Sequence, residues 1–182
     1  MRHIMIVVVG MRGAGKSIAR MYAEKNQIPY FATGAGDRVR EEVRQRALVP
    51  NPEIMARVSD ELRGKDGLGV TRLVLQAARQ SGASLVFLEG MRSWPEIELV
   101  RQEGCAVVIA FMAPRKLRLD RIRSRGRFED PPERFAHRDQ REIDYGAAIP
   151  IALADAYLLN TGTLEEADET LDAMVTKIRN SI

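Results

Sequence analysis

The chain has 182 residues, of which 45% are hydrophobic and 29% charged, so we expect one folded domain with a substantial core. No apolar run approaches the roughly 20 residues of a membrane-spanning helix, and one cysteine and two histidines are too few for a disulfide framework or a metal site built by the protein alone. The net charge of +3 is unevenly distributed, because residues 115–127 contain seven cations and one acid. This concentration of positive charge favours a local anion site over a nucleic-acid-binding surface. We expect the protein in the cytoplasm.

The first predicted elements are a buried strand at 4–9 and a helix at 18–25, joined by the segment GMRGAGKS. Its spacing, G-x-x-x-x-G-K-S, arises by chance in roughly one chain of this length in a few hundred. Glycines let the backbone N–H groups of such a loop converge on phosphate oxygens, while Lys16 would contact the β- and γ-phosphates and Ser17 would offer its hydroxyl to Mg²⁺. The predicted nucleotide-binding residues are Gly10, Met11, Arg12, Gly13, Ala14, Gly15, Lys16 and Ser17.

Residues 28–32 are short, apolar and partly aromatic and predict the second strand, with a turn at 33–37 and a helix after it. Asp37 is either the N-cap of that helix or a substrate-binding residue. Arg40 is either a solvated surface charge or a side chain that faces a ligand phosphate at the carboxyl edge of the sheet. The apolar face of this helix is predicted to consist of Val39, Val43, Ala47 and Leu48.

Two further helices are predicted before the third strand. Asn51 caps the first, which runs to about residue 63, and the second spans 70–80 with an inward face. The inward residues are predicted to be Leu73, Val74 and Ala77. The buried strand 85–88 then ends in Glu89, which is either merely solvated or a functional acid that holds Mg²⁺ or its water, or polarises an attacking hydroxyl.

A capping box at Ser93 and Glu96 opens the next helix, and residues 106–112 form the fourth predicted strand. The basic segment that follows is helical by pattern, and it places three arginines on one stripe: Arg118, Arg121 and Arg125. Guanidiniums that converge in this way repel one another unless an anion or an acid meets them, and a phosphate chain would be such an anion. A second cluster, Arg134, Arg138 and Arg141, is equally compatible with an ion-paired surface and with a ligand contact.

The remaining elements are a loop at 145–150, a fifth strand at 156–159, a turn at 160–162 and a final helix opened by a capping box at Thr163. Strands alternate with helices throughout, which predicts an α/β fold with a parallel sheet covered on both faces. The carboxyl edge of this sheet would bring together the glycine-rich loop, Asp37, Glu89, the basic segment and Asn160.

Several stretches together resemble the small P-loop kinases, the family of adenylate kinase, other nucleoside monophosphate kinases and dephospho-coenzyme A kinase. They are GMRGAGKS, TGAGDRVRE, LEGMRS, RSRGRFEDP with RDQRE, and ALADAYLLNTGTLEE. The similarity is greatest to an archaeal-type branch of that family. It implies a three-layer α/β/α fold with five parallel strands, ATP and Mg²⁺ at the glycine-rich loop, and an acceptor across the cleft under a mobile lid.

The resemblance also implies roles for particular residues. Asp37 and Arg40 would lie in an acceptor-binding insertion at about 34–66, and Arg92 would match the acceptor-binding arginine that follows the third strand. The lid, at about 115–131, would supply Arg121, Arg125 and Arg127, and Asn160 with Gly162 would border the adenine. The chain departs from the branch at Glu89, where aspartate is usual, and at Met11-Arg12, where proline and small residues are usual.

These observations predict ATP-dependent phosphoryl transfer to a small nucleotide-like acceptor. The expected catalytic residues are Lys16, Asp37, Glu89, Arg121 and Arg125. Two other functions are compatible with the motifs: a nucleotide-gated switch or ATPase that acts through a partner, and an RNA contact by the basic segment. The scarcity of aromatic residues near those arginines argues against RNA.

Overall fold

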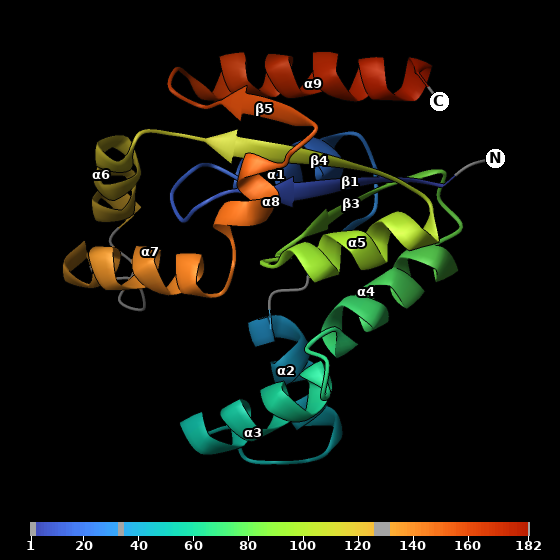
Figure 1. Ribbon diagram of the computed structural model, residues 1–182, viewed down its shortest axis with the longest axis vertical. Coiled ribbons are helices and arrows are strands. Elements are labelled where there is room, and N and C mark those ends of the chain that lie inside the picture. Colours follow the sequence, from blue (N-terminus) through green and yellow to red (C-terminus); the bar gives the residue numbers. More distant parts are fainter. Residues whose placement is uncertain (1–2, 33–34, 126–131, 182) are drawn as a thin grey trace.

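A computed structural model describes residues 3–32, 35–125 and 132–181 and consists of three layers, with a parallel sheet between two layers of helices (Figure 1). The strand order is β2-β3-β1-β4-β5, and every neighbouring pair is parallel. The predicted α/β class and its five parallel strands are therefore confirmed. The strands are β1 (Ile4–Val9), β2 (Tyr30–Ala32), β3 (Leu85–Glu89), β4 (Cys105–Met112) and β5 (Ala156–Leu159).

The helices cover both faces of this sheet. The α-helices are α1 (Ser17–Lys25), α2 (Ala35–Gln45), α3 (Pro52–Arg63), α4 (Gly69–Gln80), α5 (Trp94–Glu103), α6 (Arg115–Arg125), α7 (Phe135–Asp144), α8 (Ala148–Ala152) and α9 (Leu164–Asn180), and a 3-10 turn at Pro132–Arg134 precedes α7. One face packs against α1 and α9, and the other against α4 and α5 with the edge of α8.

The central strand β1 shows why the sheet needs both layers. All six of its residues are buried, and they alternate between the two cores. Ile6 and Val8 pack toward α1 and α9, whereas Met5 and Val7 pack toward α4 and α5. A strand that is apolar on both faces is stable only between two helical layers, which is the arrangement typical of parallel sheets.

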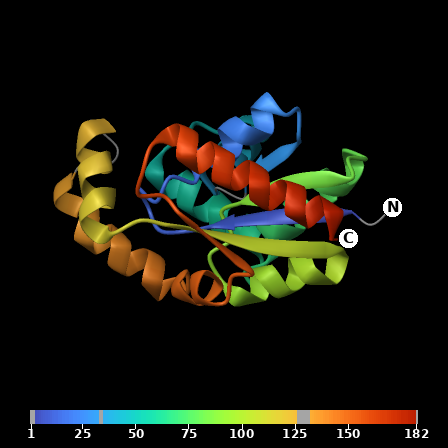
Figure 2. The same ribbon diagram turned by 90° about the horizontal axis from the view of Figure 1, so that it is seen from above.

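The carboxyl ends of the strands face α6 and α7, which lie at one end of the molecule in both ribbon views (Figures 1 and 2). At the lower end of Figure 1, α2 and α3 pack against each other around a small core of their own. That core consists of the buried residues Val39, Val43 and Val58. Two helical projections therefore flank the edge of the sheet where the glycine-rich loop lies.

Local capping follows the predicted signals. The side chain of Asn51 accepts a hydrogen bond from the Ile54 backbone N–H at 2.8 Å, and both predicted capping boxes, at the starts of α5 and α9, are present. The predicted loop at 145–150 is wrong, because residues 148–152 form the short helix α8. Pro150 is the third residue of α8, where a backbone N–H would have no partner within the helix in any case.

Two helix faces differ from expectation. In α4, Leu73 is 41% exposed, and the buried residues include Val70, Thr71 and Val74. The sequence of α4 has apolar residues on several of its sides, so the pattern alone does not fix which face is buried. The buried face includes Thr71, which donates to Glu96 of α5 at 2.9 Å. In α2, the helix ends at Gln45, and Ala47 is exposed with a φ of 53°, a left-handed conformation typical of a helix end.

Candidate active site

A cavity of about 570 Å³ lies at the carboxyl edge of the sheet and is lined by residues that are far apart in the sequence. Its walls are the glycine-rich loop, the start of α1, the segment after β3, the end of α6 and one side of α7. The predicted site residues among its lining are Gly10, Arg12, Gly13, Gly15, Lys16, Ser17, Glu89, Arg92 and Arg125. The structure therefore brings most of the predicted site together in one place.

The glycine-rich loop needs its glycines for conformation and for space. Gly10 and Gly15 have φ values of 147° and 98°, which side chains of L-residues rarely adopt. A Cβ on Gly10 would lie 2.5 Å from the Phe111 carbonyl oxygen, and a Cβ on Gly15 would collide with the side-chain amide of Asn160. The loop is thus fitted closely against β4 and the turn after β5.

Lys16 folds back onto its own loop. Its Nζ donates to the carbonyl oxygen of Gly10 at 2.8 Å. Burial lowers the pKa of Lys16 from its ordinary value, and the negative charges of Glu89 and Glu142 partly oppose this effect. An anion in the cavity would offer the ammonium group a stronger partner than a neutral carbonyl.

Glu89, at the tip of β3, is reached by a tyrosine from the neighbouring strand. The hydroxyl of Tyr30 donates to Glu89 Oε2 at 2.6 Å. Burial raises the pKa of Tyr30, and the charge of Glu89 raises it further, so the hydroxyl keeps its proton. Sequence reasoning missed Tyr30, although its place two residues before the end of the strand is a usable signal.

The stripe of arginines on α6 does not act as one unit. Both Nη atoms of Arg118 donate to the Asp139 carboxylate, at 2.7 and 2.6 Å, and the side chains are only 8% and 10% exposed. Arg118 also donates to the carbonyl oxygen of Arg12 at 3.0 Å. An acid of α7, one of the two kinds of partner expected for this stripe, therefore meets Arg118, and Arg118 braces the glycine-rich loop.

Arg121 braces the same loop through Asn160. Its Nη2 donates to both the backbone and the side-chain oxygen of Asn160, each at 3.1 Å, and the Asn160 amide donates to the Ala14 carbonyl at 2.9 Å. Burial lowers the pKa of Arg121, as does the nearby charge of Arg125. Arg125 lines the cavity, whereas Arg121 and Asn160 do not. Asn160, which the resemblance places beside the adenine, is thus buried, and its contacts support the glycine-rich loop.

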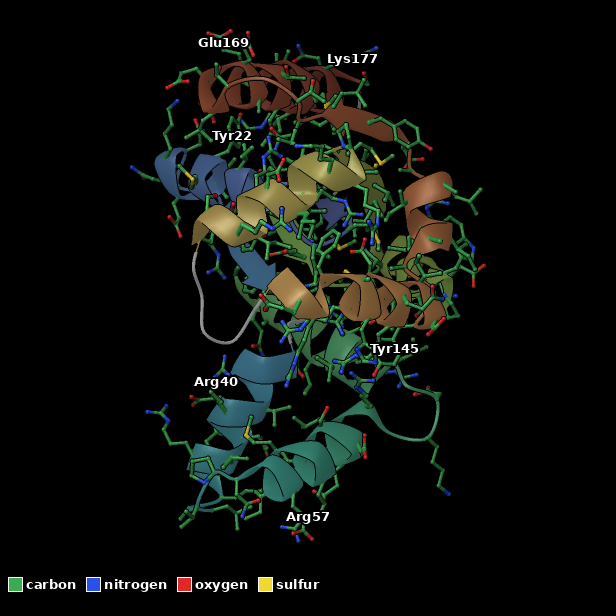
Figure 3. All side chains as sticks on the ribbon, turned by 90° about the vertical axis from the view of Figure 1, so that its left-hand side faces the viewer. Tyr22, Arg40, Arg57, Tyr145, Glu169 and Lys177 are labelled. Atoms are coloured by element: carbon green, nitrogen blue, oxygen red, sulfur yellow. The ribbon has the colours of Figure 1, made fainter. Side chains whose placement is uncertain are left out.

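Four of the other predicted residues lie outside the cavity lining. Met11 borders a second, mainly apolar pocket, Ala14 is buried, and Gly162 and Arg40 are exposed. Figure 3 shows Arg40 on α2, below the helices that surround the cavity.

Two predicted residues are not described. Arg127 lies outside the described residues, as does the side chain of Asp37. Asp37 is the third residue of α2, so the interpretation of Asp37 as the N-cap of this helix is wrong.

From α7, an acid lines the cavity instead of the arginine cluster. Arg134, Arg138 and Arg141 do not line the cavity, and Arg141 lies over the ring of Tyr145 at 5.6 Å. Glu142 does line it, and its carboxylate lies 3.3 Å from Nε of Arg92. Sequence reasoning missed this contact, because nothing in the local pattern indicates that α7 faces the loop after β3.

The described residues include neither a metal cluster built by the protein alone nor a helix that could span a membrane. Within them, no group of three or more His, Cys, Asp or Glu is placed to hold a metal ion, and no helix has the length and apolar character to cross a membrane. The Ser17 hydroxyl and the Glu89 carboxylate both face the cavity and are oxygen donors of the kind that Mg²⁺ prefers. Such a pair would suit an ion whose other ligands come from phosphates and water.

Comparison with known proteins places these features in a family. Protein TT1252 from Thermus thermophilus has a similar fold, with a TM-score of 0.69, 22% identity, and coverage of 97% of this chain and 98% of the other. A shikimate kinase from Acinetobacter baumannii, solved with shikimate, matches with a TM-score of 0.58 and 19% identity over 97% and 95% of the two chains. The fold is therefore that of the P-loop kinases, as the resemblance implied.

Curated relatives match the chain with higher sequence identity than these structures do. No family model matches the chain. A UPF0200 protein from Hyperthermus butylicus is 35% identical over 178 residues, which cover 96% of this chain and 95% of the relative. The expected archaeal-type branch is thus confirmed, and the chain belongs to the UPF0200 family.

Proposed function

We propose that the protein transfers the γ-phosphoryl group of ATP to a small, phosphate-bearing acceptor of nucleotide-like character. The observation that carries the proposal is the charge of the cavity at the carboxyl edge of the sheet. Its described lining combines a glycine-rich loop with more basic than acidic side chains. The basic residues are Arg12, Lys16, Arg20, Arg92 and Arg125, and the acidic ones are Glu89 and Glu142. This excess of positive charge suits two anionic ligands better than a neutral one.

The donor half of the site is the loop and its surroundings. Backbone N–H groups of residues 10–17 would hold the phosphates, with Lys16 released from the Gly10 carbonyl to contact the transferred group. Ser17 and Glu89 would hold Mg²⁺, directly or through water, and bound Mg²⁺ supplies neutralisation of charge on the phosphate oxygens. Arg125 and the undescribed Arg127 would approach from the segment 115–131, which we propose as the lid.

The acceptor half lies between the segment after β3 and α7. Arg92 is its strongest phosphate-binding candidate, because it lines the cavity and its present partner is the Glu142 carboxylate, an anion that a phosphate can replace. Asp37 and Arg40 belong to the segment 34–66, which we propose as the part that closes over the acceptor. The cavity continues from the loop to Arg92, so both ligands would share one cavity.

Phosphoryl transfer needs positioning and charge neutralisation more than covalent help. Lys16, Arg12 and Arg125 would neutralise the transferred group from two walls of the cavity. Glu89, at the carboxyl end of β3, would orient the attacking group of the acceptor. Arg118 and Arg121 contribute indirectly and would fix the donor site before ligand binds. Arg118 donates to the Arg12 carbonyl of the loop, and Arg121 donates to Asn160, whose amide donates to the Ala14 carbonyl of the loop.

The test uses ATP labelled in its γ-phosphate, Mg²⁺ and a panel of acceptors: nucleoside monophosphates, dephospho-coenzyme A and shikimate. We expect label in one of the phosphate-bearing acceptors and none in shikimate. Lys16→Ala should lower transfer by at least about 10²-fold, because it removes a charge that acts in the transition state. Lys177→Ala is the matched control, since Lys177 is exposed on α9, at the top of Figure 3 and away from the cavity.

Two results would contradict the proposal. Wild-type rates in Lys16→Ala would show that the site is wrongly assigned. Nucleotide-dependent binding of a partner protein, with no labelled acceptor in the panel, would favour the nucleotide-gated switch over the kinase.

A further inference from the structure

The carboxylate at the tip of β3 has a built-in support on the neighbouring strand. Strands β2 and β3 are paired in parallel with Tyr30 opposite Phe87 and Ala32 opposite Glu89. Alternate residues of a strand share a face, so Tyr30 and Glu89 lie on the same face as diagonal neighbours. The tyrosine hydroxyl reaches across to Glu89 Oε2 at 2.6 Å.

The ring of Tyr30 packs against two neighbouring side chains, which limit the freedom of its hydroxyl. It stacks on Phe87, with ring centroids 6.3 Å apart and an angle of 22° between the planes. The guanidinium of Arg20 lies 5.2 Å from its centroid, and Arg20 itself lines the cavity. The hydroxyl is therefore a fixed donor, oriented by a strand, a neighbouring ring and a helix.

We propose that Tyr30 is a positioning residue, which holds the Glu89 carboxylate in the orientation that phosphoryl transfer requires. This inference rests on the proposed function and adds to it a residue that does not itself line the cavity. The hydrogen bond fixes Oε2, and the planar carboxylate then fixes the direction of Oε1 as well. Glu89 also acts electrostatically on Lys16, so its orientation affects both walls of the donor site.

The geometry supports a permanent donor. The hydroxyl of Tyr30 lies 2.6 Å from Glu89 Oε2, on a ring that is packed against Phe87 and Arg20. A glutamate has one more rotatable bond than an aspartate, so a carboxylate at this position has more freedom to lose when it is held in one place. The tyrosine removes that freedom before ligand binds.

The experiment compares Tyr30→Phe with Tyr22→Phe. Each change removes one hydroxyl that donates to a carboxylate, Glu89 at 2.6 Å in the first and Asp172 at 2.8 Å in the second. Tyr22 and Asp172 connect α1 with α9, outside the cavity lining. Thermal unfolding of both variants checks that each is folded, so that any difference in function is due to the position of the lost hydroxyl.

Two readouts are measured. One is kcat for transfer at saturating ATP, and the other is the affinity of Mn²⁺ for the protein bound to a non-hydrolysable ATP analogue, followed by electron paramagnetic resonance. We expect Tyr30→Phe to lower one or both by about 10-fold to 100-fold, as is usual for residues that orient a ligand of a metal or a reacting group. The KM for ATP should stay within about twofold, because the loop that binds the phosphates is unchanged.

A double mutant tests whether Tyr30 acts through Glu89. In a Glu89→Gln background, Tyr30→Phe should add less than about a twofold further loss, because the oriented carboxylate is already absent. Effects that multiply in the double mutant would overturn the inference, as would a Tyr30→Phe variant that matches Tyr22→Phe in both readouts. A wild-type protein that binds no Mg²⁺–nucleotide would instead reject the proposed function, and the role of Tyr30 with it.

Discussion

The buried ion pair between Arg118 and Asp139 gives the sharpest prediction for stability. Asp139→Ala leaves the Arg118 guanidinium buried with its carboxylate partner removed, and loss of one member of a buried pair costs about 3–5 kcal/mol. The two side chains are 8% and 10% exposed, so water screens the pair little. Arg118 keeps its hydrogen bond to the Arg12 carbonyl, so we expect the lower end, about 3 kcal/mol.

Urea unfolding followed by circular dichroism measures this effect. With a slope of about 2 kcal/mol per M, a loss of about 3 kcal/mol lowers the unfolding midpoint by about 1.5 M. The matched control is Asp120→Ala, which breaks the exposed pair with Lys116 at 2.8 Å on the same helix. We expect no resolvable shift there, because exposed ion pairs contribute little.

If the two alanine variants unfold at the same urea concentration, the buried pair contributes no more to stability than the exposed pair, and the prediction is refuted. A second variant separates charge from packing: the double change Arg118→Met and Asp139→Leu should restore most of the stability, since apolar residues of similar volume replace buried pairs well. It should still bind nucleotide more weakly than wild type, because the brace on the Arg12 carbonyl is gone.

Two further predictions concern the cavity. Glu142→Gln should lower the KM for a phosphate-bearing acceptor by about 3-fold to 10-fold in steady-state assays, because it removes the anion that competes for Arg92, and an unchanged or higher KM would place the acceptor elsewhere. Gly15→Ala should abolish nucleotide binding in calorimetry, because the new methyl group collides with the Asn160 amide at a φ of 98°. Gly82→Ala, at a φ of 64° with open space around it, should keep wild-type binding and lose only about 1 kcal/mol of stability.

Local features of the chain were predictable because their causes are local. The strand, loop and helix from Ile4 to Lys25 follow from composition and spacing, and so do the caps at Asn51 and Thr163. The common location of the loop, Glu89 and Arg125 followed from one topological rule, that parallel strands end at the same edge. Reasoning of this kind needs no knowledge of how distant side chains meet.

The pairings across elements were not predictable in this way. Three arginines share one stripe of α6, yet one meets Asp139 of α7, one meets Asn160 after β5, and one faces the cavity. All three lie on the same stripe of the helix, so only the positions of the neighbouring elements distinguish them. Tyr30 and Glu89 are 59 residues apart, and only the register between β2 and β3 brings them together.

The bracing of the glycine-rich loop has a consequence for the order of folding during synthesis. The loop is complete in sequence by residue 17, yet its carbonyl groups are held by Arg118 and by Asn160. A nascent chain therefore lacks these supports until residue 160 has left the ribosome. Capture of nucleotide by a growing chain would then report that the chain has emerged as far as Asn160, and ribosome-bound chains that end before residue 118 should bind it poorly.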